Sequence, residues 1–365
     1  MNIKKYLIFL LFGTFAFAGC KTIDHGHGSG NSTSQNSLTT APNHITVNVA
    51  VVYQDPKIAA EGGKRFHDIF GYYDPHELNK IYKDSMEAVT HHTVTYKIVK
   101  VIDSDKIWTR FKDSTAYLDK NRVYKLLSDP KKNEFKAKHP KFDYKGFVKY
   151  YGFDKLRDEG KINEVWVWSW PYAGMWESEQ VGKNAFWCNS PPIKMDNEKI
   201  LTIMGFNFER TADLAMHSFG HRAESVLSKV YGRWKPLKDM TKPNNWELLT
   251  SLDKDTPGKG GVGNCHFPVN GVKDYDYANK RKVKSYASIW KNYPDLDWKK
   301  AKPEVVDCST WGCSQMGYMS WWYRHFPHFP GVNPQDKKLN NWWFYIVNYE
   351  WANQLENKLN NKANS

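Results

Sequence analysis

Two histidines four residues apart, followed by a glutamate, carry the clearest chemical pattern in this sequence. They are His217, His221 and Glu224, in the stretch ADLAMHSFGHRAESVLSKVY, with Asp213 one turn earlier. At about 100° per residue, the four side chains fall within about 80° of one another on a helix. Apolar residues occupy the opposite side. The pattern predicts a helix that is anchored by one face and presents an Asp-His-His-Glu stripe on the other.

The stripe has the residue types of a zinc site. A catalytic zinc ion takes three protein ligands at about 2.0–2.2 Å and keeps one position for water. We expect His217 and His221 as two ligands, because i and i+4 lie on one helix face. Glu224 is a candidate for the third ligand. If His266, in GNCHFPVNG, completes the set instead, Glu224 is free to act as the base.

Two other interpretations of the stripe stay open from the sequence. A solvent-exposed helix shows the same pattern, and HxxxH spacing is frequent by chance. Gly220 in the helix interior costs about 1 kcal/mol relative to alanine, which indicates close approach of another group on that side. Packing against a second helix explains that glycine as well as a ligand site does. A metal site, a metal-free cleft and a structural face are therefore all considered.

The helix is preceded by segments that predict a sheet. β-Branched and aromatic runs typical of strands occur four times before it. An edge strand near Phe186 is expected as the fifth strand. Asp74-Pro75 caps a helix that runs to about His91. We expect an α+β fold with a small twisted mixed sheet, a motif-bearing helix and an irregular, aromatic-rich C-terminal portion. The four runs are HITVNVAVVY, HTVTYKIVKVID, EVWVWSW and KILTIMGF.

This order of elements resembles the N-terminal half of zincin metallopeptidases, over roughly 44–232. The resemblance implies a zinc-dependent, peptidase-like hydrolase that uses metal-activated water. Zincins carry HExxH, in which the glutamate is the general base. Here Ser218 stands at that position and cannot replace it. The catalytic carboxylate must then be Glu224, or Glu177 or Glu179 in GMWESE.

The N-terminus, MNIKKYLIFLLFGTFAFAGC, has a basic start, an apolar run and small residues before Cys20. This is an export signal, and its ending resembles the lipobox of bacterial lipoproteins. The resemblance implies removal of residues 1–19, acylation of Cys20, and a lipid anchor in the bacterial cell envelope that faces outside the cytoplasm. Residues 20–43 are polar and predict a flexible tether. The mature protein then divides into a zincin-like half, 44–232, and a loop- and aromatic-rich half, 233–365, that packs over it.

Charge and cysteine content limit the partners. A formal net charge of +13 on an exported protein favours anionic glycans, envelope polymers or lipid head groups over nucleic acid, which we exclude as a partner. Four cysteines follow Cys20. In an oxidising compartment, the simplest of their three pairings joins Cys308 to Cys313 and Cys188 to Cys265. A single close pair argues against a zinc site built from four thiolates.

Sixteen tryptophans suggest a second function. Indole faces stack on sugar rings, and their N–H groups bind hydroxyls. The alternative to a peptide hydrolase is therefore a metal-free surface lipoprotein that binds or cleaves glycans, with Glu177 beside Trp176 as a glycosidase carboxylate. Trp166 and Trp168 lie in a predicted buried strand. At least one member of each adjacent pair is expected at the surface, the pairs being Trp321–Trp322 and Trp342–Trp343.

Calcium is a second candidate metal, because Asn270, Asp274 and Asp276 supply hard oxygen ligands in NGVKDYDYANK. A plain turn explains that stretch more simply, since the EF-hand pattern is absent. The GxGxxG pattern in PGKGGVGN lacks the preceding strand and following helix of a dinucleotide loop, so we reject it.

Overall fold

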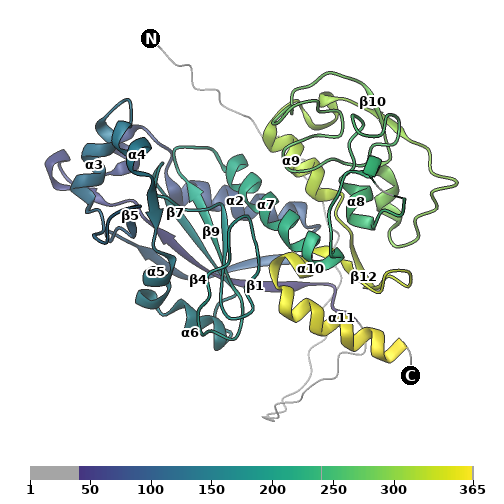
Figure 1. Cartoon of the computed structure of the whole chain (residues 1–365), viewed down its shortest axis with the longest axis horizontal. Coiled ribbons are helices and arrows are strands. Elements are labelled where there is room, and N and C mark those ends of the chain that lie inside the picture. Colours follow the sequence, from purple (N-terminus) through teal and green to yellow (C-terminus); the bar gives the residue numbers. More distant parts are fainter. Residues whose placement is uncertain (1–40, 240, 364–365) are drawn as a thin grey trace, which may run out of the picture. The chain divides into compact units, whose positions relative to one another are not determined.

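The chain folds around a five-stranded mixed sheet with the strand order β4-β1-β7-β9-β8 (Figure 1). The computed structural model describes residues 41–239 and 241–363, so the expected signal peptide 1–19, Cys20 and most of the tether lie outside the described residues. The first four strands in that order are parallel, and β8 pairs antiparallel with β9. Their bounds are β1 Ile45–Tyr53, β4 Val94–Asp103, β7 Glu164–Ser169, β8 Ser178–Val181 and β9 Leu201–Asn207.

Helices cover both faces of this sheet. Every residue of β7 is buried, as expected for a parallel strand with helices on each side. Trp166 and Trp168 enter the core that contains α2 (Pro75–Val89) and α7 (Ala212–Tyr231). Val165 and Val167 enter the opposite core, with α5 (Tyr144–Tyr151) and α6 (Phe153–Asp158). The predicted core position of both tryptophans is therefore confirmed, as is the α+β class.

The predicted strands and the capped helix are confirmed, except for the edge strand. Asp74 accepts a hydrogen bond from the His76 N–H, and Pro75 begins α2. The edge strand is β8, eight to five residues before the expected Phe186. The segment 188–193 covers its outer side: the Ser190 hydroxyl donates to the Ser178 carbonyl, and the Ile193 N–H donates to the Gln180 carbonyl. A polar strand such as Ser-Glu-Gln-Val gives no apolar pattern to detect.

A buried ion pair fixes α7 on the sheet. Arg222 and Glu164 are both inaccessible to solvent, and the Arg222 Nη1 atom lies 2.7 Å from Glu164 Oε2. The second Glu164 oxygen accepts a hydrogen bond from Trp166 Nε1 at 2.6 Å. Arg222 also donates through Nε to the Ile346 carbonyl. Each charge is therefore paired and hydrogen-bonded, as burial requires, and the neighbouring His221 is held in one direction.

The C-terminal portion supplies three helices around α7. α9 (Gln315–Arg324) and α10 (Trp342–Val347) pack against it, and α11 (Tyr349–Ala363) packs against α10. α10 and α11 are separate helices, because the backbone is non-helical at Asn348. The expected exposure fails for one pair, since Trp342 and Trp343 are both buried.

The remaining elements are short and form the connections. No helix in the described parts of the chain is long and apolar enough to cross a membrane. The short helices are α1 Phe66–Phe70, α3 Lys120–Ser128, α4 Asn133–Lys138 and α8 Asn245–Leu249. The short strands are β2 Lys57–Ile58, β3 Lys64–Arg65, β5 Thr109–Phe111, β6 Pro140–Phe142, β10 Val283–Ser285, β11 Glu304–Val306, β12 His328–Val332 and β13 Leu339–Asn341.

Candidate functional site

Three imidazoles gather beside α7. His217 and His221 come from the helix, and His266 comes from the loop that follows α8. The ring centroids lie 4.9 Å apart for His217 and His221, 5.1 Å for His217 and His266, and 4.9 Å for His221 and His266. A buried thiol, Cys265, lies beside them, and ligand atoms of Cys265, His217 and His221 are all within 4.8 Å of one another. The stripe therefore faces protein, and His217 is 2% exposed.

Gly220 allows the His266 loop to reach the helix. A Cβ atom at this position would lie 2.6 Å from Cys265 Sγ, closer than any ordinary contact. The Cys265 N–H donates to Glu224 Oε1 at 2.8 Å. The side-chain oxygen of Asn264 accepts from the His266 N–H at 3.0 Å. The close approach indicated by this glycine is thus made by Cys265, the residue before the third histidine.

Glu224 orients His221 and fixes its tautomer. Its Oε2 atom lies 3.2 Å from His221 Nδ1, so this nitrogen carries the proton. The other oxygen of Glu224 already accepts from the Cys265 N–H. Both carboxylate oxygens are therefore engaged, and His221 presents its Nε2 atom to the centre. This is the carboxylate–histidine arrangement that supports metal ligands.

The other two histidines have acceptors at the same ring position. Tyr277 donates its hydroxyl proton to the Cys265 carbonyl at 2.7 Å, so it can only accept from His217 Nδ1, 3.3 Å away. His266 Nδ1 lies 3.6 Å from a carboxylate oxygen of Asp274. With the Nδ1 atoms assigned to these partners, Nε2 is the atom through which each imidazole would bind a metal ion.

Two Nε2 atoms, of His221 and His266, and one carboxylate oxygen lie at the spacing of metal ligands. His221 Nε2 lies 3.2 Å from His266 Nε2 and 3.3 Å from Glu177 Oε2. Ligand atoms about 2.05 Å from a tetrahedral zinc ion are about 3.3 Å apart. The hydroxyl of Tyr275 lies 3.4 Å from His266 Nε2. The residues present therefore fit a zinc ion in ligand type and in spacing.

The electrostatic environment keeps His217 neutral. Burial lowers its pKa to about 3, and the neighbouring histidines and Arg210 add to the effect. Burial also lowers the pKa of His221, but the hydrogen bond and charge of Glu224, with the charge of Glu177, outweigh it and bring the pKa above its usual value. Burial raises the pKa of the Cys265 thiol, and the two glutamates raise it further. Neutral imidazole is the form that binds metals.

Cys265 uses its thiol within the protein. Its Sγ atom lies 3.4 Å from the His217 carbonyl, to which the S–H can donate, and 3.3 Å from His217 Nδ1. The expected disulfide between Cys188 and Cys265 is wrong, because both are free and buried. Cys188 Sγ instead contacts the Ser178 hydroxyl at 3.3 Å. Each thiol is held by the element against which it packs, so neither is available to the other.

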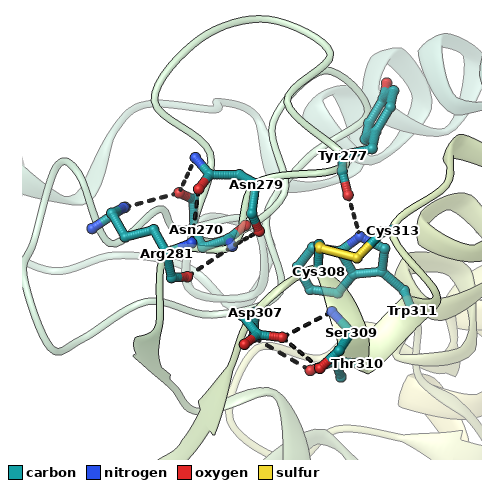
Figure 2. Close-up of a disulfide and its surroundings, with 10 residues drawn as sticks. All are labelled: Asn270, Tyr277, Asn279, Arg281, Asp307, Cys308, Ser309, Thr310, Trp311 and Cys313. Atoms are coloured by element: carbon teal, nitrogen blue, oxygen red, sulfur yellow. Dashed lines mark hydrogen bonds between the residues drawn. A yellow bond between two sulfur atoms is a disulfide. The ribbon is translucent and has the colours of Figure 1, made fainter.

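The disulfide predicted between Cys308 and Cys313 is present and supports the site indirectly. Figure 2 shows the turn that it closes, in which Trp311 Nε1 donates to the Tyr277 carbonyl at 2.7 Å. The Cys308 N–H donates to the Asn279 carbonyl at 3.0 Å. The turn closed by the disulfide therefore fixes the segment that contributes Tyr275 and Tyr277.

The candidate calcium ligands do not converge. Asn270 donates to the Asn279 and Arg281 carbonyls (Figure 2), and Asp276 accepts from Asn279 Nδ2. Asp274 faces His266. These oxygens are used in separate hydrogen bonds, as in an ordinary turn.

Glu179 is also separate from the histidines. It is buried in β8 and accepts from the Gln180 N–H, and burial raises its pKa to about 7. Of the two carboxylates in GMWESE, only Glu177 reaches His221. Ser218 donates to the Leu214 carbonyl and has a structural role. The contributions of Asp274, Tyr275 and Tyr277 were missed in the sequence, because KDYDYANK was interpreted as a turn.

Two cavities flank the centre along α7. One, of about 380 Å³, is lined by Glu177, Ser218 and Arg210 among others. The second, of about 690 Å³, includes His221 and Glu224 at one end. Both volumes are within the range of small-molecule sites, and His221 lines the second.

No protein-family model, curated protein or solved structure matches this chain. The function is therefore inferred from the geometry of the site.

Proposed function

We propose that this protein is a zinc-dependent hydrolase with His217, His221 and His266 as the metal ligands, each through Nε2. The observation that carries the proposal is the 3.2 Å separation between His221 Nε2 and His266 Nε2. His221 Nδ1 lies 3.2 Å from a Glu224 oxygen and His266 Nδ1 lies 3.6 Å from an Asp274 oxygen, so both rings present Nε2 to the centre. A zinc ion between the two Nε2 atoms would bind both through their electron pairs.

Cys265 is the competing ligand, since its sulfur is close enough. Two contacts argue against it. Its S–H has an acceptor in the His217 carbonyl, and burial raises its pKa. We therefore assign Cys265 to packing beneath the centre and leave the third ligand position to His266.

Glu177 takes the role of general base. Its carboxylate is partly solvent-exposed and lies 3.3 Å from His221 Nε2, at the edge of the cavity that it shares with Ser218. Zinc, when bound, supplies a Lewis acid and lowers the pKa of a coordinated water. Glu177 is placed to remove a proton from a water molecule in that cavity and to return it to the leaving group.

Tyr275 supplies a hydrogen-bond donor beside His266 Nε2, from which its hydroxyl lies 3.4 Å away. Its side chain is 53% exposed, and burial, with nearby negative charges, raises its pKa. The hydroxyl therefore keeps its proton near neutral pH. A donor in this position stabilises negative charge that develops on a substrate carbonyl oxygen.

The proposed setting is the bacterial cell envelope. Its support is the N-terminal sequence alone, in which Cys20 follows a lipobox-like ending. A lipid anchor at Cys20 would hold the hydrolase at the membrane surface, outside the cytoplasm, where peptides and glycans are the accessible substrates. Peptide hydrolysis is the activity that the zincin-like layout favours.

Metal analysis tests the centre. Purified wild-type protein is expected to bind about one zinc per chain, and His217→Ala, His221→Ala and His266→Ala are expected to lose it. Glu177→Gln should keep zinc, because the three imidazoles that hold the ion remain. Wild-type protein without zinc, or a His266→Ala variant that retains it, would contradict the proposed ligand set.

Activity is tested separately with a mixed peptide library. Zinc-loaded wild-type protein is expected to release new amino groups, and zinc-loaded Glu177→Gln to release at least about 100-fold fewer, the usual contribution of a general base. Full zinc occupancy without any amine release would exclude the peptidase activity.

A further inference from the structure

Two tryptophans stand at the surface of the cavity beside the candidate centre. Trp187 is 59% exposed and Trp234 is 38% exposed. Both line the cavity of about 690 Å³ that has His221 and Glu224 at one end. Most tryptophans of this protein are buried, and an exposed indole is a large apolar surface that gains free energy when a ligand covers it. Their position at one cavity indicates a binding surface.

Trp234 is held rigidly. Its Nε1 atom donates to the Thr250 hydroxyl at 2.8 Å, and its ring centroid lies 5.6 Å from that of Trp246, which is fully buried. The indole is therefore fixed by its Nε1 hydrogen bond and by Trp246, while 38% of the residue stays exposed at the cavity. A ligand that stacks on it does not have to immobilise the side chain, which reduces the entropic cost of binding.

The rest of the cavity wall is polar. The hydroxyl oxygen of Ser228 is buried and has no hydrogen-bond partner among the described residues, although a buried hydroxyl without a partner is unfavourable. Lys229, at the rim, is exposed and forms no ion pair with a described residue. Its ammonium group lies 5.9 Å from the Phe186 ring. The wall thus offers exposed indole surface, a hydroxyl without a hydrogen-bond partner among the described residues, and an ammonium group without an ion-pair partner among them.

We propose that this cavity is a saccharide subsite, and that the substrate of the hydrolase is a peptide that carries an acidic glycan. The C–H face of a pyranose ring would stack on Trp234, a ring hydroxyl would bind Ser228, and a carboxylate of the sugar would face Lys229. An aliphatic peptide side chain could cover the indole but would leave the hydroxyl unpaired. The role of the bound glycan as part of a substrate rests on the proposed hydrolase, whereas saccharide binding by the cavity does not.

Calorimetric titration of metal-free, chelator-treated protein tests the subsite. The probes are a tetrasaccharide of galacturonate and the neutral tetrasaccharide of glucose. We expect the acidic probe to bind more tightly, and Trp234→Ala to weaken it about tenfold, which corresponds to about 1.4 kcal/mol of stacking. Lys229→Gln should remove the preference for the acidic probe and leave binding of the neutral one unchanged.

Trp298→Ala is the matched control. Trp298 is 39% exposed, nearly the same as Trp234, but it contacts Tyr286 and Trp290 and does not line this cavity. It should leave saccharide binding unchanged. Trp187→Ala is a second test variant, because its removal breaks no hydrogen bond and is expected to weaken binding without affecting folding.

Three results would overturn the subsite: no binding of either tetrasaccharide, equal loss in Trp234→Ala and Trp298→Ala, or binding of an aromatic-rich peptide pool in place of both sugars. Zinc content is measured in the same preparations before chelation. Zinc binding without saccharide binding removes the subsite and keeps the hydrolase centre, and the reverse result removes the hydrolase and keeps the subsite.

Discussion

Replacing Gly220 by alanine tests how the third histidine is delivered to the centre. The new Cβ atom would lie 2.6 Å from Cys265 Sγ, so the loop must retreat by about 1 Å to reach an ordinary contact distance. Overpacking of this kind destabilises by about 1–3 kcal/mol, and alanine returns about 1 kcal/mol through helix propensity. We expect a net loss of about 0–2 kcal/mol in the free energy of unfolding.

Zinc affinity should fall more than stability does. His266 follows Cys265 directly, and metal ligands tolerate displacements of only about 0.2 Å. A loss of about 10–100-fold in zinc affinity is expected, comparable to the loss of a group that supports a ligand. Competition with a chelator at neutral pH measures the affinity, and thermal unfolding of the metal-free protein measures the stability.

The double variant Gly220→Ala, Cys265→Ala provides the control. Without the sulfur, the nearest atom of residue 265 is its Cβ, at 3.2 Å from the new methyl group, and most of the clash is relieved. The single variant Cys265→Ala should bind zinc as the wild type does. If Gly220→Ala alone binds zinc with wild-type affinity, the loop is not held against the helix as described.

Two further predictions concern stability. Glu164→Gln leaves the buried Arg222 guanidinium without its counter-charge and should lower the free energy of unfolding by about 3–5 kcal/mol, measured by urea denaturation. Asp84, which forms an exposed ion pair with Lys80, provides the control. Asp84→Asn should change the free energy of unfolding by less than about 1 kcal/mol. Burial lowers the pKa of His325 to about 4. Between about pH 4 and 6.5, the unfolded chain therefore binds more protons than the folded protein does. The free energy of unfolding should fall as the pH is lowered through that window. His325→Phe should flatten this part of the stability–pH curve by about 1–3 kcal/mol, and a variant curve that parallels the wild type would contradict the buried neutral histidine.

The main elements of the fold could be predicted because their residues repeat with the period of the structure. β1, β4, β7 and β9 are β-branched or aromatic runs, and α2 and α7 have apolar faces. The elements that were misplaced lack such a period. β8 is polar, since Ser178 and Glu179 bury their side chains by hydrogen bonding rather than by being apolar. The break at Asn348, between α10 and α11, is marked by no proline or glycine, so the sequence gives no sign that a helix ends there.

The candidate site was only half predictable for a related reason. His217 and His221 belong to one helix, where spacing defines direction. His266 was identified as a candidate, but its partners Asp274, Tyr275 and Tyr277 lie in loops whose course is set by tertiary hydrogen bonds. Sequence spacing carries no information about such contacts. The ambiguity of Glu224 has the same origin, because its second oxygen is engaged by a backbone N–H 41 residues away in the chain.

The buried pair between Arg222 and Glu164 also limits how the gene for this protein can change. One residue inserted between His217 and Arg222 would turn the first histidine by about 100° relative to the sheet, away from His266, while the arginine kept its partner. The interval between these positions should therefore have a constant length in any descendant that retains the centre.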